Sequence, residues 1–162
     1  MQTLEDLFQE LLLYRDRTLD PSSLGPWLQH KITTCTFPNL NHIPFATETY
    51  TRNWIAREST TCEGFEALIM RWDKQAQTSI HGHPAFSFYH VISGVFEMEL
   101  FSFEAVNCLK LKENRCFYPS DTTWCLGQVG RYDNFIHRIT CLEAGLTFHV
   151  YSEDAQKGMS LS

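Results

Sequence analysis

Short segments rich in β-branched and aromatic residues follow one another from Thr49 onward, and turn residues separate them. Short strands at this spacing predict an all-β sandwich or a small barrel. The predicted strands cover residues 49–57, 65–72, 87–92, 95–103, 106–112, 115–118, 122–128, 134–141 and 145–152. Ser93-Gly94, between two apolar runs, predicts a tight hairpin turn. The fold class is therefore mainly β.

The first part of the chain has a different, helical pattern. Apolar residues recur there at i, i+3, i+4, i+7 and i+8, namely Leu4, Leu7, Phe8, Leu11 and Leu12. Thr3 and Asp6 predict a capping box, and Asp20-Pro21 predicts the end of this helix. A shorter helix is predicted to begin near Pro26. We expect both helices to cover the outside of the β structure.

The sequence contains no repeat, low-complexity run or linker that would mark a second domain. We therefore expect one domain over residues 1–162, since this length suffices to bury a core. It would comprise a helical segment over 1–46, a barrel core over 47–152 and a short tail over 153–162.

Composition narrows the classes of partner. Asp and Glu number 19 against 13 Lys and Arg, with no basic run, which excludes the basic surface that binds nucleic acid. No stretch approaches the roughly 20 apolar residues of a membrane span, and the acidic start is no signal peptide. The six cysteines form no C-x-x-C pair and are expected to be reduced thiols. These features favour a cytoplasmic protein without membrane contact, and we expect a monomer.

The densest chemistry lies in Ile80-His81-Gly82-His83-Pro84. In an extended segment, residues i and i+2 point to one face, so His81 and His83 can direct two imidazoles at one metal. A third histidine, His137, stands in an apolar predicted strand. In a barrel it is a candidate third ligand, although such a histidine alone is more often a core residue.

The spacing H-x-H-x3-Ser87-x6-Gly94 resembles the first motif of the cupins, and His137 resembles the histidine of their second motif. Cupins usually carry Glu where Ser87 stands, and its loss leaves the three-histidine set of the thiol dioxygenases. The chain specifically resembles the cysteine dioxygenase type I family over residues 48–152. Further segments carry this resemblance: Tyr50-Thr51-Arg52-Asn53, Trp72 nine residues before His81, Glu113-Asn114-Arg115-Cys116-x-Tyr118, His137-Arg138 and Thr147-x-His149-x-Tyr151-Ser152.

The resemblance implies a jelly-roll barrel that binds Fe(II) through His81, His83 and His137. It implies oxidation of L-cysteine by O2 to cysteine sulfinic acid. The remaining roles that it implies fall on neighbouring strands: Arg52 binds the substrate carboxylate with Tyr50 beside it, His149 and Tyr151 are catalytic, and Thr147 and Trp72 support them. A guanidinium fork suits a carboxylate, and the alternation of Thr147, His149 and Tyr151 puts all three on one sheet face.

Three departures from the family leave alternatives open. Ser87 replaces the cysteine that animal relatives crosslink to the tyrosine matched by Tyr151. Residues 119–136 contain an insertion that we interpret as a longer hairpin at the pocket mouth. Cys141 replaces an asparagine, and the short tail leaves the pocket wall undetermined. The alternatives are a dioxygenase for another small thiol such as 3-mercaptopropionate, or a non-catalytic cupin that senses or stores a ligand. A zinc isomerase or hydrolase would explain neither Arg52 nor the row from Thr147 to Tyr151.

Overall fold

The structure is a computed structural model that describes residues 1–60 and 63–161. Its two α-helices are α1 (Leu4–Arg17) and α2 (Leu24–Ile32). The strands are β1 (Tyr50–Arg57), β2 (Glu66–Trp72), β3 (His81–His83), β4 (Phe86–Ala105), β5 (Cys108–Phe117), β6 (Thr122–Leu126) and β7 (Asn134–Tyr151). Three 3-10 turns, η1 (Pro21–Ser23), η2 (Leu40–His42) and η3 (Ala155–Lys157), complete the description.

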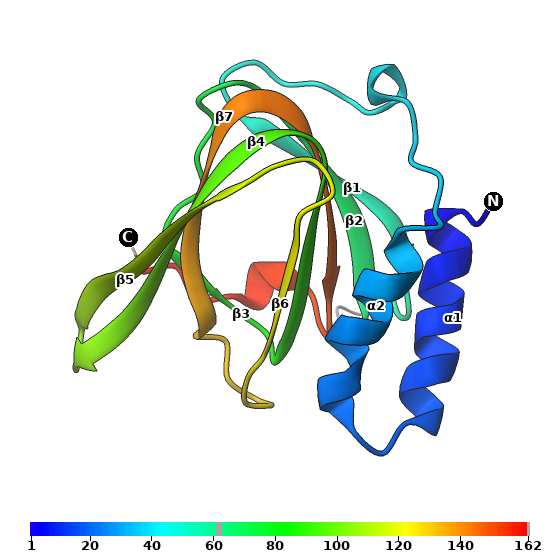
Figure 1. The fold of residues 1–162 in the computed structure, drawn as a ribbon. Helices are drawn as coiled ribbons and strands as arrows, with labels where there is room; N and C mark the ends of the chain where they lie inside the picture. The colour runs from blue at the N-terminus through cyan, green and yellow to red at the C-terminus, as the bar shows by residue number, and fades with distance from the viewer. Residues whose placement is uncertain (61–62, 162) are drawn as a thin grey trace.

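The two long strands β4 and β7 pair with each other and bend together into a barrel (Figure 1). The other edge of β4 pairs first with β6 and then with β5. The other edge of β7 pairs first with β3 and then with β2, which in turn pairs with β1. All of these pairings are antiparallel. The mainly β prediction is confirmed.

The predicted hairpin at Ser93-Gly94 is wrong, because β4 continues through it as one strand. Gly94 has a φ of 87°, and the register with β7 shifts on both sides of Ser93. A Cβ on Gly145 would lie 2.1 Å from the Ser93 carbonyl oxygen, so the two strands touch closely at this bend. The breaks predicted within 106–118 and 134–152 are likewise absent. Glycine with positive φ here makes a bulge that bends a paired strand instead of a turn.

Alternating residues of the barrel strands face two separate cores. Phe86 and Phe88 on β4, with Phe148 and Val150 on β7, belong to the outer core, which also contains the buried leucines of α1 and α2. Residues between them in sequence, such as Tyr89 and Tyr151, belong to the inner core. The period of two in a strand therefore places Thr147, His149 and Tyr151 of β7 on the inner face of the barrel.

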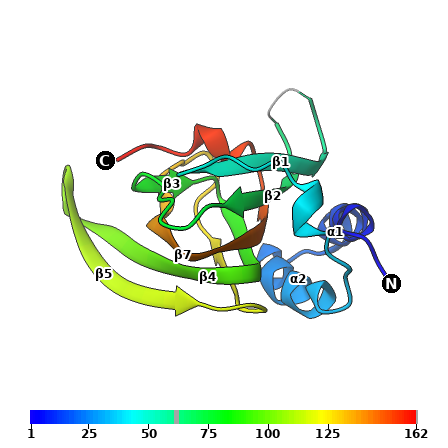
Figure 2. The same cartoon turned by 90° about the horizontal axis from the view of Figure 1, so that it is seen from above.

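The helices pack on the outer face of the barrel, as expected (Figure 2). The capping box of Thr3 and Asp6 is confirmed, and α1 ends at Arg17, three residues before Asp20. The second helix begins at Leu24 instead of near Pro26, because Asp20 caps a 3-10 turn that leads directly into it. These helices close one side of the barrel and leave the interior to the strands.

Among residues 1–60 and 63–161, no helix combines the length and apolarity that a membrane span requires. Five cysteines are free thiols, namely Cys35, Cys108, Cys116, Cys125 and Cys141. This agrees with the expected reduced state for those five, whereas Cys62 lies outside the described residues.

His90 on β4 makes folding stability depend on pH. Its ring stacks on Phe37 at 5.6 Å, and Nδ1 lies 2.8 Å from Thr122 Oγ1. Burial lowers the pKa of His90 from 6.5 to about 4. The unfolded chain therefore takes up a proton at higher pH than the folded one, so this stability is complete above pH 6.5 and decreases as the pH falls towards 4. We expect His90→Gln to remove about 2–3 kcal/mol of this loss, measured by urea unfolding between these pH values. An unchanged pH slope would contradict it.

Candidate functional site

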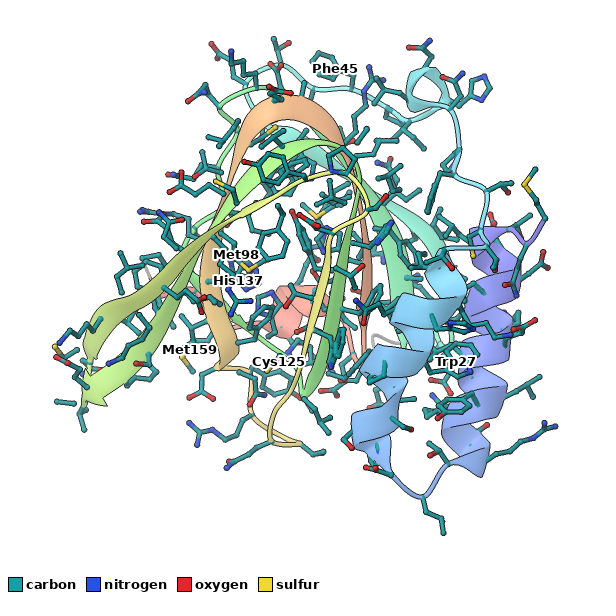
Figure 3. The ribbon with its side chains drawn as sticks, viewed as in Figure 1. Trp27, Phe45, Met98, Cys125, His137 and Met159 are labelled. Atoms are coloured by element: carbon teal, nitrogen blue, oxygen red, sulfur yellow. The ribbon has the colours of Figure 1, made fainter. Side chains whose placement is uncertain are left out.

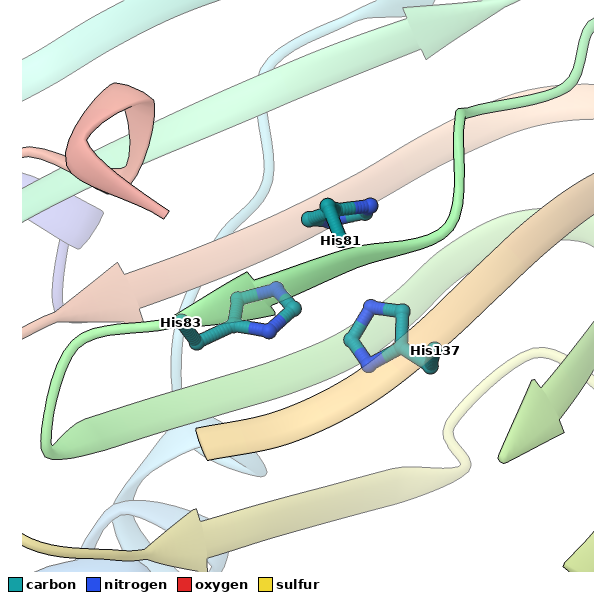
Figure 4. Close-up of side chains that lie close together, drawn as sticks. All are labelled: His81, His83 and His137. Carbon is teal, nitrogen blue, oxygen red and sulfur yellow. The ribbon is translucent and has the colours of Figure 1, made fainter. Parts of the chain in front are cut away.

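The three predicted ligands His81, His83 and His137 meet inside the barrel (Figure 4). The register of β3 on β7 places His81 directly opposite His137. Their ring centroids are 5.0 Å apart, and His83 lies 4.6 Å from His81 and 4.3 Å from His137. One potential ligand atom from each ring lies within 4.8 Å of the others. The strand pairing thus brings together residues that are more than 50 positions apart in the sequence.

Hydrogen bonds orient two of these rings. His81 Nδ1 donates to the Ser79 carbonyl at 2.8 Å, and His83 Nδ1 donates to the Phe135 carbonyl at 3.0 Å. Each Nε2 consequently keeps its lone pair, which is the arrangement that metal-binding histidines show. The Nδ1 of His137 is buried and has no hydrogen-bond partner within the described part of the chain. A buried polar atom normally has a partner, so the unpartnered Nδ1 of His137 is consistent with a ligand atom for a metal ion.

The electrostatics of the group also suit a metal. Burial lowers the pKa of His81, and burial together with neighbouring histidines lowers the pKa values of His83 and His137 well below 6.5. Neutral imidazole is the form that ligates metals. Three neutral rings can each offer a nitrogen lone pair without first losing a proton, so the residues present fit a metal ion.

Gly82, between the two histidines, is required by the backbone that crosses it. A Cβ at this position would lie 2.4 Å from the Tyr132 carbonyl oxygen and 2.5 Å from Asp133 Cα. The Gly82 N–H donates to the Met159 carbonyl, and the Met159 N–H donates to the Tyr132 carbonyl. The loop before β7 and the C-terminal segment therefore enclose β3 and hold both histidines in place.

A cavity of about 180 Å³, here called the central cavity, opens onto the histidines. Its lining residues are Tyr50, Arg52, Met70, Trp72, Thr78, Ser79, His81, His137, Ile139, His149, Tyr151, Ala155, Gly158 and Ser160. His83 is fully buried and does not belong to this lining. At roughly 30 Å³ per water, this volume corresponds to about six waters, which is the space of a small ligand.

Trp72, Thr147, His149 and Tyr151 form a continuous hydrogen-bonded row along the inner face of the barrel. Trp72 Nε1 donates to Thr147 Oγ1 at 2.8 Å, and Thr147 Oγ1 lies 2.7 Å from His149 Nε2. His149 Nδ1 lies 2.9 Å from the Tyr151 hydroxyl. Burial, and the positive charge of Arg52, lower the pKa of His149 to about 3, so the ring is neutral.

The indole at the start of this row sets its direction. An indole N–H can only donate, so Thr147 accepts from it and has its own proton to give to His149 Nε2. His149 then carries its proton on Nδ1 and donates it to the Tyr151 oxygen. This order satisfies every member and leaves the Tyr151 O–H to donate into the central cavity. Burial raises the pKa of Tyr151, which keeps that proton in place.

Arg52 and Tyr50 lie on the same face of β1 and both line the central cavity. Tyr50 packs against Trp72, with ring centroids 4.5 Å apart. The Arg52 Nη2 lies 3.7 Å from Glu66 Oε1, and the Arg52 side chain is 28% exposed. Within residues 1–60 and 63–161, the Arg52 guanidinium has this ion pair as its contact and makes no hydrogen bond. Arg52 thus lines the cavity with a guanidinium that is not held by hydrogen bonds to the described residues.

The C-terminal segment forms the pocket wall that the sequence analysis left undetermined. Leu161 N donates to the Ile80 carbonyl, and Ser160 pairs with His81, so the segment runs beside β3 and contributes Ala155, Gly158 and Ser160 to the cavity lining. Residues 119–136 contain β6, which pairs with β4, and the start of β7, and none of them lines the central cavity. Their interpretation as a hairpin at the pocket mouth is therefore not supported.

Sequence reasoning missed Glu66, a buried acid in the predicted strand 65–72. Its available signal was parity, since the acid shares a strand face with Trp72 that is otherwise apolar. Ser87 was noted, and the register places it directly opposite Tyr151 with its hydroxyl buried and unpartnered within the described residues. Figure 3 shows that His137 shares the barrel interior with Met98.

Removing the central hydroxyl of the row tests its energetics. Thr147→Val keeps the shape but leaves Trp72 Nε1 and His149 Nε2 buried without partners. We expect a loss of about 1–3 kcal/mol per orphaned group in the free energy of unfolding. The measurement is the urea midpoint at an unchanged slope. Thr140→Val, which removes an exposed contact with Gln77, is the control and should change little. Equal effects of the two variants would argue against the row.

Comparisons with known proteins bear on the fold. No family model matches the chain, and no curated protein matches it. A cupin superfamily protein from Desulfitobacterium hafniense has a similar structure, with 11% identity, a TM-score of 0.53 and coverage of 73% of this chain and 90% of that one. KdgF from Halomonas sp. gives 19% identity and a TM-score of 0.52, covering 75% and 94%.

A mutant of the Bacillus subtilis oxalate decarboxylase gives 16% identity and a TM-score of 0.52, over 75% of this chain and 30% of that one. A further structure of that decarboxylase concerns its Mn(II) centres. At these identities the likeness concerns the fold alone. The chain has the cupin jelly-roll fold, as expected, with a three-histidine group that can hold a metal.

Proposed function

We propose that this protein is a non-haem iron(II) thiol dioxygenase that oxidises L-cysteine with O2 to cysteine sulfinic acid. The observation that carries the proposal is the pairing, in one small cavity, of a neutral three-histidine group with the uncommitted guanidinium of Arg52. A cavity of about 180 Å³ is too small for most cofactors, but it suits an amino acid with a short side chain.

The absence of a carboxylate ligand favours a thiol substrate. Fe(II) held by His81, His83 and His137 would keep its double positive charge, favour the thiolate form of a bound thiol and supply the electronic means of reaction with O2. In the net reaction, both oxygen atoms of O2 bond to the substrate sulfur, and the thiol hydrogen remains on the sulfinic acid. No other reductant is needed.

The residues of the chain would then bind and orient the substrate. Arg52, which lines the cavity, would hold the carboxylate through two parallel N–H···O bonds. The Tyr151 hydroxyl, supported by His149 and Thr147, would donate a hydrogen bond to the reacting atoms. The C-terminal segment would cover one side of the bound substrate with Ala155, Gly158 and Ser160.

Oxygen uptake by iron-loaded protein tests the proposal. L-cysteine should be consumed with one O2 per thiol, and mass spectrometry should show a product heavier by two oxygen atoms. Protein loaded with zinc should be inactive, because zinc has no redox chemistry. Faster turnover of 3-mercaptopropionate would overturn cysteine as the substrate and keep the reaction class. Metal and thiol binding without oxygen uptake would favour a ligand-binding cupin instead.

A further inference from the structure

Glu66 is a buried acid beside the central cavity, in contact with β1 and with the C-terminal segment. It lies on β2 directly opposite Tyr151, and its side chain is 3% exposed. Trp54 Nε1 donates to Oε2 at 3.0 Å, and the Ala155 N–H donates to Oε1 at 3.0 Å. Both carboxylate oxygens therefore have partners, which is the condition under which a buried acid is tolerated.

The relation of Glu66 to Arg52 differs from an ordinary salt bridge. The closest nitrogen–oxygen distance is 3.7 Å, within ion-pair range but longer than a hydrogen bond. At this distance Glu66 attracts the guanidinium without accepting a hydrogen bond from it, and its two oxygens accept from Trp54 and Ala155. The positive charge is thus balanced while the hydrogen-bonding fork stays available.

We infer that Glu66 is the positioning residue for Arg52, holding its guanidinium over the central cavity for the substrate carboxylate; this rests on the proposed function. Arginine has a long, flexible side chain, and β1 alone does not restrict it to one direction. A fixed negative charge on β2 restricts it. Through Ala155, the same carboxylate joins Arg52 to the C-terminal wall, so the carboxylate-binding side of the cavity forms as one unit.

Glu66→Gln tests this inference, because it removes the charge with little change of shape. The chain offers a matched control in Glu58, a carboxylate that pairs with Arg15 at 2.7 Å and also accepts from the Phe65 N–H. Glu58→Gln makes the same change of net charge in an ion pair whose residues do not line the cavity. The two variants should therefore differ in which arginine they release.

The first readout is the side-chain Nε–H signal of each arginine in ¹⁵N NMR spectra of metal-free protein. We expect Glu66→Gln to shift and broaden the Arg52 signal and leave Arg15 unchanged, and Glu58→Gln to do the reverse. An Arg52 signal identical in wild type and Glu66→Gln would overturn the inference. Should the amide disturb folding beside the Trp54 N–H, the double variant Trp54→Phe/Glu66→Gln removes that donor and allows the same comparison.

The second readout is thiol binding to cobalt(II)-loaded protein, followed by thiolate-to-metal charge-transfer absorption. Glu66→Gln should weaken L-cysteine binding about 10-fold, by analogy with supporting groups around ligands, and leave cysteamine, which has no carboxylate, nearly unchanged. Equal weakening of both thiols would overturn the positioning role. Failure of the wild type to bind any thiol would instead refute the proposed function, whereas the NMR comparison would still decide whether Glu66 holds Arg52.

Discussion

Replacing His81 with alanine is expected to weaken metal binding by more than about 100-fold, since the loss of a mere supporting hydrogen bond already costs 10- to 100-fold. Two imidazoles, those of His83 and His137, would remain, and they are too few for a stable site in competition with water. Thiol oxidation should disappear with the metal. The measurement is metal per chain after dialysis, together with oxygen uptake.

His81 is the most informative of the three positions because it is the least buried. Its side chain faces the cavity, so truncation leaves little uncompensated space in the core, and the fold should persist. His90→Gln is the matched control, since it alters a buried histidine on the helix side of the same barrel. Retention of metal in His81→Ala, or its loss in both variants, would contradict the three-histidine site.

Local signals were sufficient for the elements that do not depend on distant partners. The apolar stripe of α1 and the capping box of Thr3 each depend on residues within a few helical turns of one another, and the sequence predicts both. Gly94 shows the limit of such reasoning. A turn and a bulge have the same local signature, and only the pairing of β4 with β7 on both sides decides for the bulge. The number of strands was therefore overestimated.

The residues of the candidate site also fall into those that local patterns predict and those that depend on contacts between distant segments. The H-x-H spacing predicted His81 and His83 as ligands, and the family resemblance added His137 and Arg52. Strand parity predicted Thr147, His149 and Tyr151 on one face. Glu66 and the C-terminal wall were not predicted, because their roles arise from contacts across the barrel. The Ala155 N–H donates to Glu66, which lies 89 residues earlier in the sequence, and no local sequence pattern predicts that hydrogen bond.

Arg52→Ala is expected to lower kcat/KM for L-cysteine about 30-fold or more, because truncating one partner of a charge-paired contact costs roughly 2–5 kcal/mol. The effect should fall mainly on KM. A carboxylate remote from the reacting sulfur makes the same contact before and during the reaction, so its loss removes uniform binding. Arg52→Lys should recover part of the loss, since it restores the charge without the fork.

The choice of substrates separates recognition from general damage. Cysteamine lacks the carboxylate, so its kcat/KM should change little in Arg52→Ala. Arg71→Ala is the matched control, because Arg71 on β2 donates to the Ile43 carbonyl and does not line the cavity. A loss that is equal for both thiols would mean that Arg52 supports the barrel and not the substrate. A loss confined to L-cysteine would assign the carboxylate to Arg52, because no other arginine or lysine lines the central cavity in the described residues.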